Sequence, residues 1–142
     1  MHPHKFAVLS TMLIGALCGT VSAAEIKGAE ILNHPCGKVA VKAMGLLNQG
    51  KFEEANKLST KALQDRWNAR PAKEREMMAG LAKEMSPSEG EYIAMVKAGG
   101  LLVVDDQAGK LTVTQKTQDA NGSSTRTITT KFAVSGGECL MD

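Results

Sequence analysis

The residues best suited to chemistry in this chain are two cysteines and a histidine. Cys36 follows His34 in the short sequence HPC, and Cys139 lies near the end of the chain in ECLMD. Two thiols and an imidazole can form a disulfide, a reactive thiol pair or part of a metal site. A zinc site needs four ligands at recognisable spacings, and the sequence after residue 24 has no CxxC pair and no second histidine. We therefore expect no metal and no cofactor, and we expect His34 to begin a helix.

The start of the chain indicates which of these chemistries applies. Lys5 precedes a run of about 15 apolar and small residues, AVLSTMLIGALCGTV, and the small residues of SAAE follow. This pattern predicts a secretory signal peptide over residues 1–24, cut after Ala23 or Ala24. The run is shorter than the roughly 20 residues that a membrane-spanning helix needs. We expect one domain over 25–142 in the periplasm or secreted, with no membrane span after cleavage, and Cys18 removed with the leader.

Export then favours a disulfide between the two cysteines that remain. In oxidising compartments a pair of cysteines usually forms a bond, and only one connectivity exists for Cys36 and Cys139. The bond would close a loop of about 100 residues and join the last strand to the first helix. Free thiols, an intermolecular bond and a reactive pair remain as alternatives.

Composition limits the classes of partner. The chain has 17 basic and 15 acidic residues, for a formal net charge of +2, and only 4% of its residues are aromatic. Nucleic-acid binding usually needs a basic stripe interleaved with aromatic side chains, so we expect no nucleic-acid partner. Trp67 is the single tryptophan, and it either packs the end of a helical hairpin or lies at the mouth of a pocket.

The elements that must position these residues are helices first and strands afterwards. Hydrophobic periodicity predicts helices over 35–49, 51–68 and 71–85, and a shorter helix ending near Lys97. Ser86 and Glu89 fit a capping box for that last helix. Met77, Met78, Leu81, Ala82 and Met85 form one apolar helix face that we expect to be buried, because methionine fills irregular gaps in cores. The adjacent charges in RWNARPAKERE read as a solvated helix face.

From residue 100 the apolar period changes to two. Strands are predicted over 101–105, 110–118, 124–135 and 138–142, with a hairpin turn at Asn121–Gly122 and a tight turn at the GG pair. The fold class is therefore α+β, with N-terminal helices packed on a curved four-stranded antiparallel meander, a cystatin-like roll. The outer sheet face is rich in threonine, and a homodimer through this face is one expected assembly.

The mature chain resembles the nuclear-transport-factor-2-like, or ketosteroid-isomerase-like, superfamily, in particular its small secreted bacterial branch of unknown function. The resemblance rests on Gly50, Phe52 and Ala55 in a G-x-F/Y-x-x-A element, and on loose strand motifs. Those motifs are Gly109 with Val113, the Asn121–Gly122 turn, Phe132 with Gly137, and CLMD. The final strand of the superfamily usually has a tryptophan where this chain has Cys139 or Leu140.

The resemblance implies a cone between the helices and the sheet. Enzymes of the superfamily hold an aspartate base and a tyrosine there, for which Tyr92 and either Asp105 or Asp106 are the nearest equivalents. No pair takes these roles clearly, so we assign no catalytic residue. The expected function is an exported, non-catalytic domain that binds a small ligand or a protein. The candidate pocket residues are Met77, Leu81, Tyr92, Val113, Ile128 and Phe132.

Two other functions are kept as alternatives. One is a small ketosteroid-isomerase-like enzyme. The other is a helical-hairpin adaptor that binds peptides, because GLLNQGKFEEANKLSTKAL is similar to a tetratricopeptide hairpin. Such repeats need about three copies to bury a stable core, and no second copy lies 34 residues away.

Overall fold

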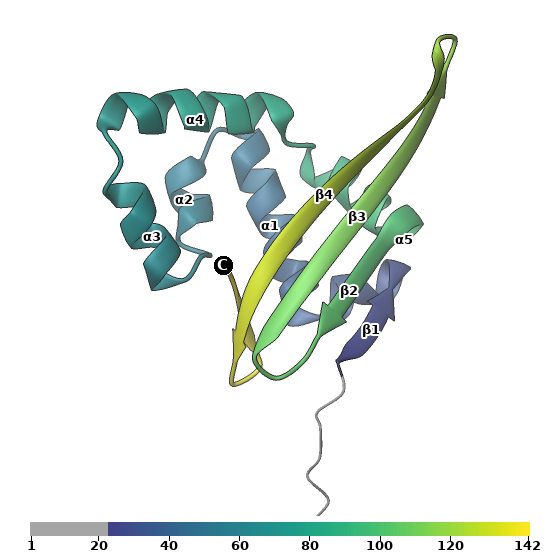
Figure 1. The fold of residues 1–142 in the computed structure, drawn as a ribbon, viewed down its shortest axis with the longest axis horizontal. Helices are drawn as coiled ribbons and strands as arrows, with labels where there is room; N and C mark the ends of the chain where they lie inside the picture. The colour runs from purple at the N-terminus through teal and green to yellow at the C-terminus, as the bar shows by residue number, and fades with distance from the viewer. Residues whose placement is uncertain (1–22) are drawn as a thin grey trace, which may run out of the picture.

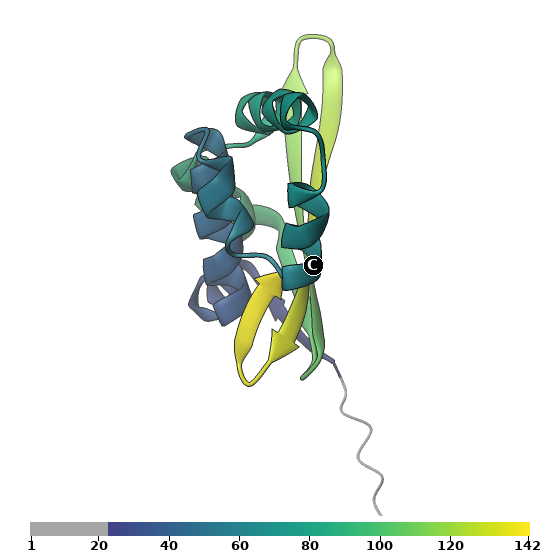
Figure 2. The same ribbon diagram turned by 90° about the vertical axis from the view of Figure 1, so that its left-hand side faces the viewer.

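The computed structural model describes residues 23–142 and confirms an α+β domain (Figures 1 and 2). Within this range a short strand and a 3-10 helix come first, five helices follow, and four strands end the chain. The helical elements are η1 Gly28–Asn33, α1 Pro35–Asn48, α2 Phe52–Asn56, α3 Lys61–Asn68, α4 Ala72–Met85 and α5 Glu89–Gly99. The strands are β1 Ala24–Lys27, β2 Gly100–Val104, β3 Ala108–Asp119, β4 Gly122–Ser135 and β5 Glu138–Met141. Apart from its last two residues, the predicted signal peptide, with Cys18, lies outside the described residues.

Within residues 23–142 the sheet has five strands, not the four predicted. Their order is β1-β2-β3-β4-β5, and each neighbouring pair is antiparallel, which confirms the meander. The additional strand is β1, in which Ala24 lies opposite Val104 of β2. A strand of four residues directly after an apolar leader is too short for its alternation to be recognised. The sheet is open, with β1 and β5 at its edges.

The β3–β4 hairpin is the longest feature of the sheet and projects past the helices (Figure 1). Its turn lies one residue earlier than predicted, since Ala120 and Asn121 connect the strands and Gly122 already pairs with Asp119. The Asp119 carboxylate accepts a hydrogen bond from the Asn121 N–H at 2.8 Å, which closes a local turn. Gly122 has φ of 126°, a value that favours glycine, so the glycine is still required.

The helices gather on one side of the sheet, and the main core lies between the sheet, α1, α5 and η1 (Figure 2). Strand alternation directs one set of side chains toward the helices. The largest fully buried side chains are Ile31, Cys36, Tyr92, Val96, Leu102, Leu111 and Val113. This core fixes α1 and α5 on the sheet, whereas α2, α3 and α4 lie toward the β4–β5 edge.

The single helix predicted over 51–68 is in fact two helices, α2 and α3. Between them the chain is drawn to β5, where the Met141 N–H donates to the Leu58 carbonyl at 2.9 Å and the Thr60 N–H donates to the Met141 carbonyl at 2.8 Å. Ser59 is buried at this junction and forms a parallel bridge with Met141. Thr60 then caps α3 by accepting the Leu63 N–H. This long-range pairing overrides the local helical pattern.

The predicted capping box is present but uses different residues. Ser88, not Ser86, is the N-cap of α5, and its hydroxyl accepts the Glu91 N–H at 3.2 Å. The Glu91 carboxylate accepts the Ser88 N–H in return at 3.2 Å. SPSEGE contains two overlapping Ser-x-x-Glu patterns, so the motif alone did not fix the start of the helix. Ser86 instead ends α4, where its N–H bonds the Ala82 carbonyl.

The prediction that the apolar face of α4 is buried is wrong for three of its five residues. Met77, Leu81 and Met85 are 61%, 51% and 67% exposed. Met78 and Ala82, the other two residues of the predicted face, are half-buried as that prediction requires. Because the apolar residues of α4 span a wide face, periodicity could not decide which part of it turns inward.

Candidate functional site

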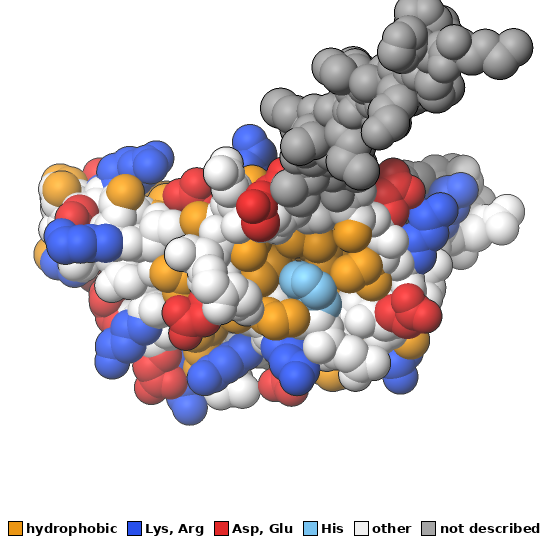
Figure 3. All heavy atoms as spheres, turned by 90° about the horizontal axis from the view of Figure 1, so that it is seen from below, with side chains coloured by type: hydrophobic (Ala, Val, Ile, Leu, Met, Phe, Trp, Pro, Cys, Tyr) orange, Lys and Arg blue, Asp and Glu red, His pale blue; other side chains and the backbone are white. Residues whose placement is uncertain are grey.

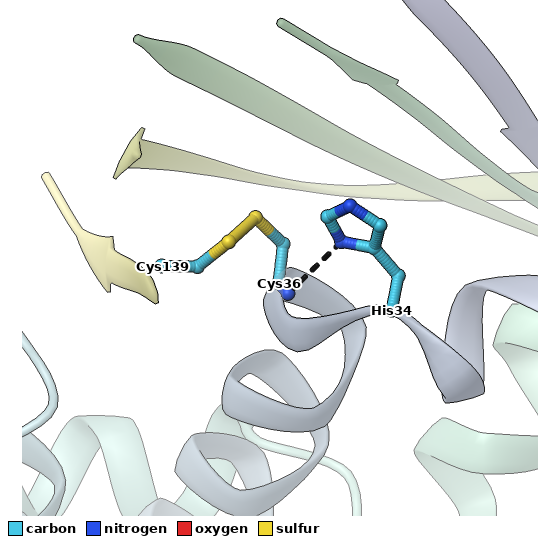
Figure 4. Close-up of side chains that lie close together, drawn as sticks. All are labelled: His34, Cys36 and Cys139. Atoms are coloured by element: carbon cyan, nitrogen blue, oxygen red, sulfur yellow. Dashed lines mark hydrogen bonds between the residues drawn. A yellow bond between two sulfur atoms is a disulfide. The ribbon is translucent and has the colours of Figure 1, made fainter. Parts of the chain in front are cut away.

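The disulfide between Cys36 and Cys139 is present, as predicted (Figure 4). It joins the first turn of α1 to β5 across a Cα–Cα distance of 5.0 Å and a sequence separation of 103 residues. Both cysteines are buried in the core. The bond therefore ties the two ends of the domain together from inside, and a disulfide of this kind is typical of exported proteins.

His34 serves as the N-cap of α1. Its Nδ1 accepts a hydrogen bond from the Cys36 N–H at 3.1 Å, and its ring lies beside the disulfide in Figure 4. The ligand atoms of His34, Cys36 and Cys139 lie within 4.8 Å of one another, but the two sulfurs are bonded to each other. Figure 3 shows apolar side chains around a histidine on the face seen from below. The cluster is therefore structural, and His34 begins a helix as expected.

Tyr92 lies in the core of the domain. Its side chain is fully buried, and its hydroxyl has no hydrogen-bond partner among residues 23–142. Burial raises the pKa of Tyr92 to about 12, because the phenolate would lose its hydration. Thr130 lies near enough to lower this pKa slightly, without good hydrogen-bond geometry. The tyrosine therefore stays protonated at ordinary pH.

Asp105 is used in the turn between β2 and β3. Its carboxylate accepts the Gln107 and Ala108 N–H groups, each at 2.8 Å, and these bonds hold the pKa of Asp105 below its usual value. Asp106 follows it in the same turn. The structure does not gather these acids and Tyr92 around one cavity, as an isomerase site would require.

The six predicted pocket residues do not meet around one cavity either. Met77 and Leu81 point outward from α4. The other four belong to the packed interior: Tyr92, Val113 and Phe132 are buried, and Ile128 is half-buried against them.

A cavity of about 380 Å³ lies elsewhere, between the helices and the β4–β5 edge of the sheet. Such a volume falls at the lower end of the roughly 300–1,000 Å³ that is typical of small-molecule sites. Its apolar wall comes from α1, α2, α3, α4 and β5, through Leu47, Phe52, Ala55, Leu63, Trp67, Met78 and Met141. Its remaining lining is polar or charged: Asn56, Ser59, Arg66, Arg70, Thr129, Thr130, Lys131 and Asp142.

Two aromatic rings hold one wall of the cavity in place. Phe52 of α2 and Trp67 of α3 stack with ring centroids 4.1 Å apart and planes 27° from parallel. The Trp67 indole N–H also donates to a Glu53 carboxylate oxygen at 3.3 Å, and Trp67 is only 7% exposed. Trp67 therefore does both things that the sequence left open, since it packs the helices and lines a cavity.

Three cations and one carboxylate belong to the lining. Arg70 is paired with Glu74 at 2.8 Å, and the Asp142 carboxylate accepts the Thr60 hydroxyl at 3.2 Å. Arg66 and Lys131 form no ion pair with any residue of the described chain. The cavity thus combines an apolar wall with unpaired positive charge from α3 and β4.

The edge of β4 also presents backbone groups to this cavity. The Lys131 carbonyl accepts the Asp142 N–H at 2.9 Å, so the backbone of Lys131 faces away from β3. In an antiparallel ladder this direction alternates, so the N–H and C=O of Thr129 face the same way. The pairing with β5 stops at Phe132, which leaves the Thr129 groups without a strand partner.

Sequence reasoning did not find this cavity. Arg66 and Arg70 were interpreted as part of a solvated helix face, and both are exposed, but the sequence did not show that they border a cavity. The sequence signal that could have found the cavity is its aromatic residues. The chain has only four of them after residue 24, and two of these, Phe52 and Trp67, line the cavity.

Within residues 23–142, no helix combines the length and the apolar character that crossing a bilayer requires. Comparison of the chain with protein-family models, with curated proteins and with solved structures found no match.

Proposed function

We propose that this protein is an exported, non-catalytic binding domain whose cavity between the helices and the β4–β5 edge holds a small ligand. The observation that carries the proposal is the mixed lining of this cavity. A stacked Phe52–Trp67 pair forms part of its apolar wall, and Arg66 and Lys131 add cations that have no ion-pair partner among residues 23–142. Apolar walls with a few placed polar groups are the usual form of a small-molecule site.

The chemistry of the lining supports binding over catalysis. General acid–base catalysis needs a proton donor and acceptor within reach of one substrate. In the lining of this cavity, Asp142 is the one carboxylate and there is no histidine or cysteine. The Asp142 side chain already accepts a hydrogen bond from Thr60.

We further propose that the domain is a distant member of the nuclear-transport-factor-2-like superfamily. The helices-then-meander order and a cavity between the helices and the β4–β5 edge of the sheet support this assignment. The resemblance was based on four strands, so β1, the additional first strand of the open sheet, is a difference from the expected pattern.

Native mass spectrometry of protein from the exported fraction tests the binding proposal. We expect a native mass that exceeds the denatured mass by one small molecule, with a denatured mass that fixes the cleavage site near Ala23 or Ala24. Twice the denatured mass would indicate the homodimer, for which the outward threonines of β3 and β4 offer a polar face. If the native mass equals the denatured mass and no compound added in a broad small-molecule screen raises the melting temperature, the cavity is not a binding site.

A further inference from the structure

The shape and charge of the cavity limit which ligand can occupy it. Leu63 and Trp67 of α3 and Met78 of α4 offer contact to an apolar body. The volume of about 380 Å³ admits one compact molecule. Burying apolar surface there contributes about 25 cal/mol for each Å² removed from water.

The positive charges lie on two different elements. Arg66 belongs to α3 and Lys131 to β4. Both are exposed residues at the border of the same cavity, and neither has an ion-pair partner in the described chain. The unpartnered Thr129 N–H lies on the same strand edge and is a further donor. A guanidinium, an ammonium and a backbone N–H are the groups that proteins use to hold a carboxylate.

We propose that the ligand is a small amphipathic anion, a carboxylate with a compact apolar body. The carboxylate lies between Arg66 and Lys131, and the body contacts Phe52, Trp67 and Leu63. This inference rests on the proposed function, because it names the chemical class of the ligand for the same cavity. Asp142 in the lining disfavours a second negative charge on the ligand, so the cavity selects a monoanion over a dianion.

Trp67 provides a direct readout, because it is the only tryptophan in the chain and it lines the cavity. The full-length exported protein is titrated with octanoate and, separately, with 1-octanol while the Trp67 emission is followed. We expect both to change the emission, with octanoate binding about tenfold more tightly at low salt. Octanedioate, the matching dianion, should bind more weakly than octanoate. The preference for octanoate over octanol should shrink at high salt, because partly exposed charges are screened.

Charge variants show which residues cause the preference. Arg66→Gln and Lys131→Gln should each weaken octanoate binding about three- to tenfold, the range for partly exposed charge-assisted contacts. Neither variant should alter 1-octanol binding. Lys97→Gln removes the same charge from an exposed position on α5 outside the cavity lining and should leave both affinities unchanged. Melting curves confirm that all three variants are folded.

The outcomes separate this inference from the proposed function. Equal binding of octanoate and 1-octanol, or equal effects of Lys97→Gln and Arg66→Gln, would overturn the anion inference and leave a neutral-ligand cavity. If neither probe changes the emission of folded protein, the anion inference is also wrong, and the native mass decides the proposed function alone.

Discussion

Removing the Cys36–Cys139 bond should take away a large share of the stability of this domain. The bond closes a loop with a sequence separation of 103 residues, nearly the whole described chain. In the chain-entropy account, a loop of this length restricts the unfolded state by about 4–5 kcal/mol. A domain of this size has roughly 5–15 kcal/mol of total stability, so the reduced protein should be marginal at 37 °C.

The location of the bond affects how the loss should appear. Both cysteines are nearly inaccessible, at 0% and 4% exposure, so a thiolate cannot reach the sulfurs of the folded protein. Reduction should therefore be slow in buffer and should accelerate with denaturant, because the domain must open first. The reduced unfolded chain is less restricted and exposes more surface, so the denaturant m-value should rise.

Urea unfolding of the oxidised and reduced protein, followed by the Trp67 emission, measures both effects. Cys18→Ser is included in every protein so that a third thiol cannot exchange with the bond. A Cys36→Ala, Cys139→Ala double variant serves as a reduced form that cannot reoxidise. A difference under about 1 kcal/mol between the oxidised protein and both reduced forms would refute the reasoning, because the cross-link would then not restrict the unfolded chain as its length requires.

Three further predictions concern individual side chains and one glycine. The raised pKa of Tyr92, about 12 against 10 when unfolded, stabilises the fold fully below pH 10. As the pH rises from 10 through 12, about 2–3 kcal/mol of this stability is lost, because the unfolded chain ionises first. The free energy of unfolding should therefore fall more steeply in this range than that of Tyr92→Phe, and parallel pH profiles would contradict the prediction. The double variant Met77→Gln, Leu81→Gln should change the melting temperature by less than about 2 °C, since both side chains are mostly exposed. A large drop in melting temperature would mean that these side chains are buried in solution. Gly37→Ala should cost about 3 kcal/mol, because a Cβ would lie 1.8 Å from a backbone carbonyl of η1. Gly80→Ala, with nothing within 4 Å of its Cβ, is the control and should stabilise α4 slightly in the same thermal melts.

Local chemistry in the sequence predicted much of this fold. The two cysteines left after the leader allow one pairing, and the Gly136–Gly137 turn needs positive φ at both residues, which the structure has at 59° and 81°. Errors arose where two local answers were equally good. Ser86 and Ser88 both begin a capping pattern, and α4 has apolar residues on two adjacent faces, so only packing could choose.

The cavity depends on contacts that no local pattern contains. A continuous helix over 52–68 would be about 25 Å long and would carry Trp67 away from Phe52. The break at Ser59, held by Met141 from the other end of the chain, lets α2 and α3 lie side by side and stack these rings. The same last strand is fixed to α1 by Cys139. A packed interior and a hollow one need the same apolar residues, so the apolar pattern does not reveal a cavity. The cavity arises from the path of the chain at Ser59, which separates α2 from α3. The disulfide that stabilises the domain therefore also helps to hold the cavity in place.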